Sequence, residues 1–281
     1  MTPFALIRRT AELFRSAGIP DPETDSALLL SFLCNRPSLA LRLDTDTVLS
    51  DEMLEKYYLL SERRITREPL QYITNEAPFC GRVFYVDSRV LIPRPETELL
   101  CHWALELPLS EGMSVLDLCC GSGCIGLTIA AEKPGISVLL SDISSDALDV
   151  ASINAERLGL RVRTNCGDLT SGLPDRCFDL IISNPPYIPS GECAFLQPEV
   201  KQEPYAALDG GMDGLDFYRR IIKESTRTLK QNGMLMMEIG LMESEPVCSF
   251  LRQYGYASIE IRKDFSGIDR MILSRLHSED A

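Results

Sequence analysis

Histidine and tryptophan are scarce in this 281-residue chain, which contains two histidines and one tryptophan. It has ten cysteines, but no pair of C-x-x-C motifs appears among them. Structural zinc sites are built from cysteine and histidine at short, regular spacings. We therefore expect no metal site, and we interpret the cysteines as small buried apolar residues in a reducing compartment.

Long apolar runs are missing as well. The longest are short and interrupted by polar residues, which argues against a transmembrane helix. The first ten residues carry Arg8 and Arg9 after a few apolar residues and lack a signal-peptide core. The apolar share of 45% and the charged share of 25% are typical of soluble globular proteins. We expect a cytoplasmic protein with no membrane association.

Positive charge is in deficit, since the formal net charge is −13. Residues 1–92 hold 11 basic and 13 acidic side chains, a balance of −2, whereas residues 93–281 hold 17 and 28, a balance of −11. No insert rich in lysine and arginine appears. An acidic surface disfavours non-specific contact with a phosphate backbone, so we expect no direct nucleic-acid binding.

The first third of the chain has helical periodicity. Apolar residues recur at helical spacing over 3–17, 23–34 and a short piece at 39–43, and a fourth helix begins after Ser50, a plausible N-cap. Residues 77–92 change to a strand-like period and predict a β-hairpin that turns near Gly81 or at 87–88. We predict a helical bundle over 1–75, a hairpin linker over 76–92 and a second domain over 93–281.

The remainder of the chain alternates strands and helices. Such alternation predicts a parallel sheet with helices on both faces. No helix separates the last two strands, so one of them should pair antiparallel with its neighbour. The predicted strands cover 115–119, 138–142, 162–166, 178–183, 234–239, 258–263 and 271–274, and the predicted helices cover 123–133, 145–158, 214–230 and 243–254.

The first of these strands runs into a glycine-rich turn. Gly121, Gly123 and Gly126 have the spacing of a turn that brings a ligand close to the backbone and opens a helix. Asp142 ends the second strand, 25 residues after Asp117, near the roughly 20-residue offset of an acid that accepts ribose hydroxyls.

The third strand ends at Asp168 and Leu169. Asp168 can accept the exocyclic amine of an adenine, and Leu169 can lie against the ring. Open α/β sheets bind ligands at the carboxyl ends of their strands. The glycine turn after the first strand and the acids after the second and third strands therefore predict a nucleotide-like cofactor site.

The fourth strand ends in Asn184-Pro185-Pro186-Tyr187. Two prolines end a strand abruptly and stiffen the loop. The Asn184 side-chain oxygen and the Pro185 carbonyl can each accept one N–H of an NH2 group, and Tyr187 offers a face on which a conjugated plane can stack. This motif suits a planar nitrogen that attacks an electrophilic methyl group.

These motifs together resemble the protein-(glutamine-N5) methyltransferases that modify peptide chain release factors, and the resemblance spans nearly the whole chain. Besides the glycine turn and Asn184–Ile188, it rests on four further segments, at 68–73, 91–98, 203–204 and 207–211. The Asn-Pro-Pro-Tyr motif alone is less specific, because DNA and RNA amino-methyltransferases share it.

The resemblance implies a class I S-adenosylmethionine methyltransferase fold, an α/β Rossmann-like seven-stranded sheet with a small N-terminal helical bundle joined by a β-hairpin. It implies methyl transfer from S-adenosylmethionine to a glutamine amide in the GGQ loop of class I release factors, which tunes translation termination. We expect a monomer whose helical domain docks the factor. The implied catalytic residues are Asn184, Pro185, Pro186 and Tyr187; the implied cofactor-binding residues are Cys119, Cys120, Gly121, Ser122, Gly123, Asp142, Asp168, Leu169 and Asn184.

Cys119 departs from the family pattern, which has glycine there. We expect Cys119 in an ordinary β conformation, with Gly121 and Gly123 making the close approach. Arg94 and Thr97 are placed at the edge of the cofactor site, Glu238 is interpreted as a structural carboxylate with backbone partners, and the loop over 189–213 as a lid over the glutamine.

Two alternatives remain open at this point. One is a DNA adenine or RNA guanine amino-methyltransferase, which would normally present a basic recognition surface. The other is a non-catalytic binding protein that kept the fold and lost the cofactor, for which Cys119 is the support.

Overall fold

The computed structural model describes residues 1–277, which form two compact units. The first unit contains Met1–Glu76 together with the short segment Gln197–Gln202. The second contains Ala77–Leu196 and residues 203–277 of the described chain. No helix within residues 1–277 combines the length and the apolar character needed to cross a membrane.

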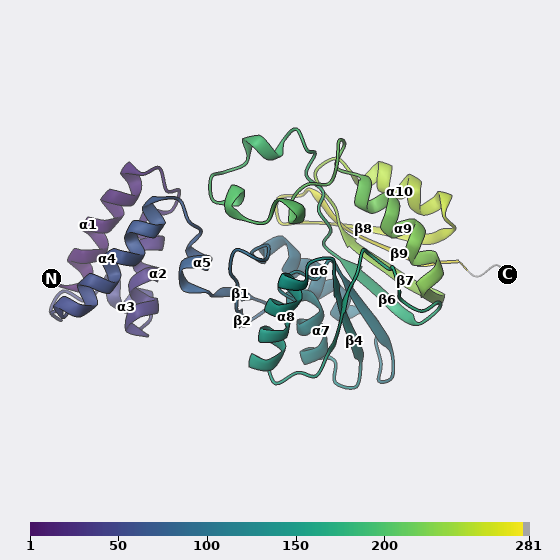
Figure 1. Ribbon diagram of the computed structural model, residues 1–281, viewed down its shortest axis with the longest axis horizontal. Helices are drawn as coiled ribbons and strands as arrows, with labels where there is room; N and C mark the ends of the chain where they lie inside the picture. The colour runs from purple at the N-terminus through teal and green to yellow at the C-terminus, as the bar shows by residue number, and fades with distance from the viewer. Residues whose placement is uncertain (278–281) are drawn as a thin grey trace. The chain divides into compact units, whose positions relative to one another are not determined.

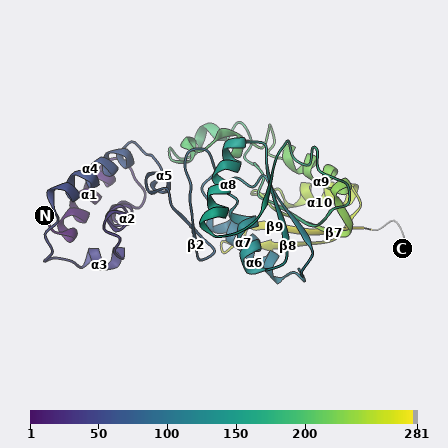
Figure 2. The ribbon, with the colours of Figure 1, turned by 60° about the horizontal axis from the view of Figure 1, so that its bottom comes forward.

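The first unit is helical, as predicted, and its helices can be followed in Figure 2. Ser50 is confirmed as an N-cap, because its hydroxyl accepts a hydrogen bond from the Met53 backbone N–H at 3.3 Å. Phe14, Leu29, Leu30 and Tyr57 are fully buried in its core. The helices are α1 (Pro3–Ser16), α2 (Pro22–Cys34), α3 (Ser38–Arg42), α4 (Asp51–Ile65) and the unpredicted one-turn α5 (Leu70–Thr74).

The segment Gln197–Gln202 joins this unit through an ion-pair network. Glu199 accepts hydrogen bonds from Arg64 at 2.9 Å and from Arg67 at 2.6 Å. Arg64 is nearly buried and also pairs with Asp25 at 2.8 Å. A buried guanidinium needs such partners, because an unpaired charge inside a protein is costly. The middle of the long loop over 189–213 thus belongs to the helical unit.

The second unit begins with a β-hairpin of β1 (Ala77–Phe79) and β2 (Arg82–Phe84), which turns at Cys80 and Gly81. The hairpin is shorter than predicted, and residues 85–92 form no strand. The reason lies in Asn154, whose side chain accepts from the Tyr85 N–H at 2.6 Å and donates to the Tyr85 carbonyl at 3.0 Å. These hydrogen bonds occupy the backbone N–H and carbonyl of Tyr85, which a longer hairpin would use to pair with the opposite strand.

The rest of this unit is built around a seven-stranded sheet (Figure 1). Its strand order is β5-β4-β3-β6-β7-β9-β8, and all neighbours are parallel except β9, which runs antiparallel to both β7 and β8. The prediction of one antiparallel strand is confirmed. The strands are β3 (Ser114–Leu118), β4 (Ser137–Asp142), β5 (Arg163–Cys166), β6 (Phe178–Ser183), β7 (Leu229–Glu238), β8 (Tyr256–Lys263) and β9 (Asp269–Leu276).

Helices cover both faces of this sheet, because its central strands are apolar on both sides. Leu180 and Ile182 of β6 belong to one core cluster, and Ile181 between them belongs to the other. The first cluster packs against α6 (Pro95–Glu106), α7 (Cys124–Glu132) and α8 (Ser145–Arg157); the second packs against α9 (Asp216–Thr228) and α10 (Ser244–Gln253). In register, Leu118 lies opposite Ser141 on one side and Ser183 on the other, so β3, β4 and β6 end at one level.

Candidate functional site

A pocket of about 320 Å³ opens at the carboxyl ends of β3, β4, β5 and β6. Its size is within the range of small-molecule sites. Seven predicted site residues line it: Cys119, Gly121, Asp142, Asp168, Leu169, Asn184 and Pro186. The remaining predicted residues, Cys120, Ser122, Gly123, Pro185 and Tyr187, lie next to these in the chain but do not line the pocket.

The glycine turn after β3 is built on left-handed backbone. Gly121 has φ +52° and Gly123, which precedes the first residue of α7, has φ +76°. Cys119 has φ +59°, so the prediction of an ordinary β conformation for this residue is wrong. Its side chain makes this conformation strained, at a cost on the order of 1 kcal/mol relative to glycine.

Gly126, the third glycine of the spacing, serves packing rather than ligand approach. A Cβ atom there would lie 2.5 Å from the Leu140 side chain and 2.9 Å from that of Asp117. Its N–H donates to Asp117 Oδ2 at 2.7 Å. Burial raises the pKa of Asp117 to about 7. Gly126 therefore lets α7 sit directly on the sheet and fixes the direction of the turn.

Asp142 is held in a fixed orientation by the backbone. Its Oδ2 accepts from the Gly121 N–H and its Oδ1 from the Ser144 N–H, each at 2.9 Å. Burial raises the pKa of Asp142, and these hydrogen bonds oppose that shift. Each carboxylate oxygen keeps a second lone pair, so two neighbouring hydroxyl groups can still donate to it.

Asp168 is exposed, in contrast, and pairs with Arg220 at 2.7 Å. This partner was not predicted from the sequence; it comes from α9 and also lines the pocket. Leu169 is buried and has φ +49°, so it is a second strained residue in the pocket wall. Its apolar side chain offers a surface for a flat ring.

Asn184 belongs to a chain of hydrogen bonds that ends at a buried carboxylate. Its Nδ2 donates to Thr97 Oγ1 at 3.1 Å, and Thr97 Oγ1 donates to Glu238 Oε2 at 2.7 Å. Tyr187 donates its hydroxyl proton to Glu238 Oε1 at 3.2 Å. Because Nδ2 is engaged by Thr97, the Asn184 carbonyl oxygen is the atom of this amide left to accept from a ligand.

Glu238 thus has side-chain hydroxyls as partners, and the expectation of backbone partners is wrong. It is 1% exposed, and burial raises its pKa while the hydrogen bonds from Thr97 and Tyr187 lower it. Its place in the sequence, an acid at the end of the apolar β7, was a usable signal that Glu238 belongs to the site. Thr97 lies at the start of α6, on the side that faces Asn184.

Two glycines, Gly210 and Gly214, pack closely against the loop that follows Asn184. A Cβ at Gly210 would lie 2.7 Å from Tyr187 Cα, and one at Gly214 would lie 2.5 Å from the Tyr187 carbonyl oxygen. Ile188 donates its N–H to the Leu208 carbonyl at 3.0 Å, and its own carbonyl accepts from Gly210 at 2.8 Å. Only residues without a side chain allow this contact, which fixes the backbone of the Asn-Pro-Pro-Tyr motif.

Arg94 was predicted at the edge of the cofactor site, but it forms an ion pair with Glu203. The other oxygen of Glu203 accepts from the Ile92 N–H at 3.0 Å. Glu203 is buried and so secures the chain that leads into α6. Arg89 lines the pocket instead, and the sequence offered no signal for it.

Comparisons with known proteins agree with this arrangement. Residues 96–196 match the family described as methyltransferase small domain, and residues 5–74 match the family described as PrmC N-terminal domain. A methyltransferase structure from Pyrococcus furiosus has the same fold, with a TM-score of 0.54 and 16% identity over 80% of this chain and 99% of that chain.

Two curated relatives are much more similar in sequence. The release factor glutamine methyltransferase of Clostridium acetobutylicum is 42% identical over 256 residues, which cover 89% of this chain and 90% of the relative. That of Geobacter sulfurreducens is 40% identical over 260 residues, which cover 92% and 91%. The predicted class I methyltransferase fold is confirmed, and the chain belongs to the release factor glutamine methyltransferase family.

Proposed function

We propose that this enzyme transfers a methyl group from S-adenosylmethionine to the side-chain amide nitrogen of a glutamine in a class I peptide chain release factor, at its GGQ loop. The observation that carries this proposal is the orientation of Asn184. Its amide group donates to Thr97, so its carbonyl oxygen accepts from the ligand. A primary amide of a substrate offers the matching N–H donors.

The pocket residues fit the cofactor. The Asp142 carboxylate, held by two backbone N–H groups, can accept both ribose hydroxyls, and Leu169 and Asp168 can hold an adenine ring and its amine. The left-handed turn at Gly121 lets a ligand approach the backbone, since a Cβ added there meets nothing within 4 Å. S-adenosylmethionine supplies an electrophilic methyl group on its sulfonium.

The chain's own contribution is placement of the amide nitrogen. The lone pair of an amide is delocalised, so the nitrogen is a weak nucleophile until its NH2 group is held and turned. The Asn184 oxygen and the Pro185 carbonyl can each accept one N–H, and Tyr187 can support the amide plane. Positioning of this kind can lower a barrier by several kcal/mol, on the order of 7 or more in the best cases.

Asn184 orients rather than deprotonates, because an amide oxygen is no base at neutral pH. The amide nitrogen becomes acidic once it carries the new methyl group, so its proton leaves afterwards. Glu238, which holds Thr97 and Tyr187, is a positioning residue in this scheme.

The helical unit is the proposed docking surface for the release factor. Leu39, Leu43 and Val48 are 68%, 73% and 75% exposed there, and such apolar side chains favour a protein partner. The acidic balance of residues 93–281 opposes nucleic acid as the substrate. We propose that the enzyme acts as a cytoplasmic monomer.

Methyl transfer from labelled S-adenosylmethionine tests the proposal. The label is offered separately to a purified release factor, to the same factor with its loop glutamine replaced, and to DNA and RNA. We expect label only in the unaltered factor. Label in nucleic acid, or label that survives replacement of the glutamine, would overturn the amide assignment.

A further inference from the structure

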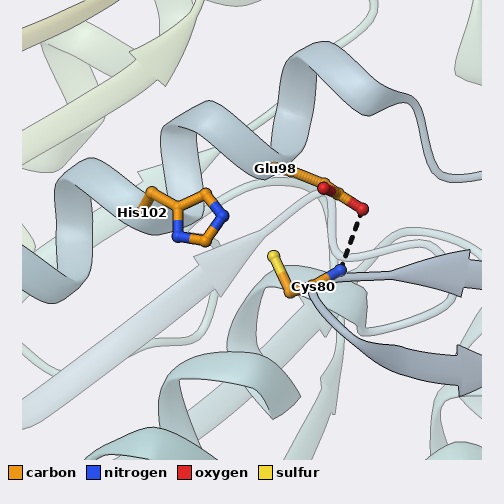
Figure 3. Close-up of side chains that lie close together, drawn as sticks. All are labelled: Cys80, Glu98 and His102. Carbon is orange, nitrogen blue, oxygen red and sulfur yellow. Dashed lines mark hydrogen bonds between the residues drawn. The ribbon is translucent and has the colours of Figure 1, made fainter.

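Three side chains with metal-binding atoms meet at the tip of the β1–β2 hairpin (Figure 3). Cys80 lies in the hairpin turn, and Glu98 and His102 lie one turn apart on α6. The Cys80 sulfur, a carboxylate oxygen of Glu98 and a ring nitrogen of His102 all lie within 4.8 Å of one another. In Figure 3 the three side chains converge on one space between the hairpin and the helix.

The hairpin turn holds Cys80 against the helix. Cys80 and Gly81 have φ +46° and +73°, the positive values of a tight hairpin turn that favours Asn-Gly. A cysteine in the first position is strained, and its partly buried side chain packs against the first core cluster. The Cys80 N–H donates to Glu98 Oε1 at 2.9 Å, which ties the turn to α6 and leaves the other carboxylate oxygen available for coordination.

The immediate surroundings suit a cation. The buried Cys101 thiol hydrogen-bonds the Cys80 sulfur. Arg82 lies nearby, but its guanidinium pairs with Glu132 at 2.6 Å, which offsets its charge. Glu98 adds a negative charge from the helix side. His102 is exposed, so its ring can turn without disturbing the core.

We propose that Cys80, Glu98 and His102 bind a zinc ion, with water in the fourth position. Thiolate, imidazole and carboxylate are the ligands that zinc takes in proteins, and their donor atoms stand about 3.5 Å apart in a tetrahedral site. The three donor atoms lie within 4.8 Å of one another, and the exposed imidazole of His102 can turn toward the other two. The ion would clamp the hairpin to the outer side of α6, the helix whose first turn carries Thr97.

Metal titration of the reduced, chelator-treated enzyme tests this site. Zinc is added in competition with a chromophoric chelator, and cobalt is added separately to report thiolate coordination through its charge-transfer band. We expect one zinc per chain, a thiolate-to-cobalt band and a higher thermal unfolding temperature with zinc. No stoichiometric binding, or binding without the thiolate band, would overturn the proposal.

Matched variants assign the ligands. We expect Cys80→Ser and His102→Ala each to weaken zinc binding by at least about tenfold. Losses of this size are found even when only a residue that hydrogen-bonds to a metal ligand is changed. Cys166→Ser and His277→Ala are the controls, because Cys166 is an exposed cysteine and His277 is the only other histidine. Equal affinity in the Cys80 and His102 variants, or equal losses in the controls, would refute the assignment. Because His102 is exposed, His102→Ala keeps the test valid if Cys80→Ser fails to fold.

Discussion

At the β6 end of the pocket, Asn184 is connected through Thr97 to the buried Glu238, whereas at the β5 end Asp168 is exposed and pairs with Arg220. The first arrangement fixes the position of the Asn184 side-chain amide and determines which way its oxygen and its nitrogen point. The second leaves a carboxylate in water, where a neighbouring ion pair contributes little rigidity. The Asn184 end of the pocket therefore fixes the position of a bound group, whereas the Asp168 end attracts a ligand without fixing its position.

This difference follows from what each end is proposed to do. Methyl transfer requires the amide nitrogen in line with the methyl group, and misplacement by about 1 Å can cost a hundredfold in rate. Holding an adenine requires only an acceptor near its amine. Changes at the Asn184 end should therefore affect turnover, and changes at the Asp168 end should affect affinity, with Asp142 between them.

The largest effect is expected from Asn184→Ala. Loss of the oriented oxygen should lower kcat by about 10³-fold, the scale on which a single positioned polar group acts in catalysis. The dissociation constant of S-adenosylmethionine, measured by calorimetry, should change only modestly. Asn184→Asp is the matched variant, since it keeps the shape and an acceptor oxygen but cannot donate to Thr97. Near-normal turnover in Asn184→Ala would refute the role of Asn184, and near-normal turnover in Asn184→Asp would refute the need for the contact with Thr97.

Thr97→Val should lower kcat by about tenfold to a hundredfold, because Asn184 loses the acceptor that fixes its flip. Thr97→Ser retains the hydroxyl and should remain near the parent enzyme. The split between kcat and KM separates positioning from simple loss of stability, since a damaged fold would also weaken cofactor binding. If valine leaves kcat unchanged, the β6 end is not the rigid end.

Asp142→Ala should raise the dissociation constant of S-adenosylmethionine tenfold or more, about 1.4 kcal/mol. The variant removes the acceptors proposed for ribose and frees the Gly121 N–H that Asp142 holds. Asp146→Ala, an exposed acid on the first turn of α8, controls for the lost charge. Equal affinity for the Asp142 variant and the parent enzyme, measured by calorimetry, would remove the ribose assignment.

The sequence predicted the strand ends well, because strand–helix alternation and apolar runs depend on local pattern. It did not predict the contacts that make the site rigid. Thr97 and Glu238 are 141 residues apart, and Asn184 and Thr97 are 87 apart, so no spacing rule joins them. The left-handed Cys119 was missed because a cysteine rarely adopts positive φ, although the glycine that the family has at this position was a signal for it. The proximity of Cys80 to Glu98 and His102 was missed because these two residues follow it by 18 and 22 positions, outside the familiar zinc spacings.

The smallest effect is expected from Asp168→Asn, which should weaken S-adenosylmethionine binding by about threefold and leave kcat unchanged. An exposed hydrogen bond contributes only about 0.5–1.5 kcal/mol, and asparagine still offers one oxygen acceptor. Arg220→Ala is the companion variant, because it removes the cation that occupies Asp168 Oδ2. Removal of this competitor should leave affinity equal or slightly tighter. A loss at Asp168 larger than that at Asp142, or a fall in kcat, would show that the open end of the pocket also sets the geometry of transfer.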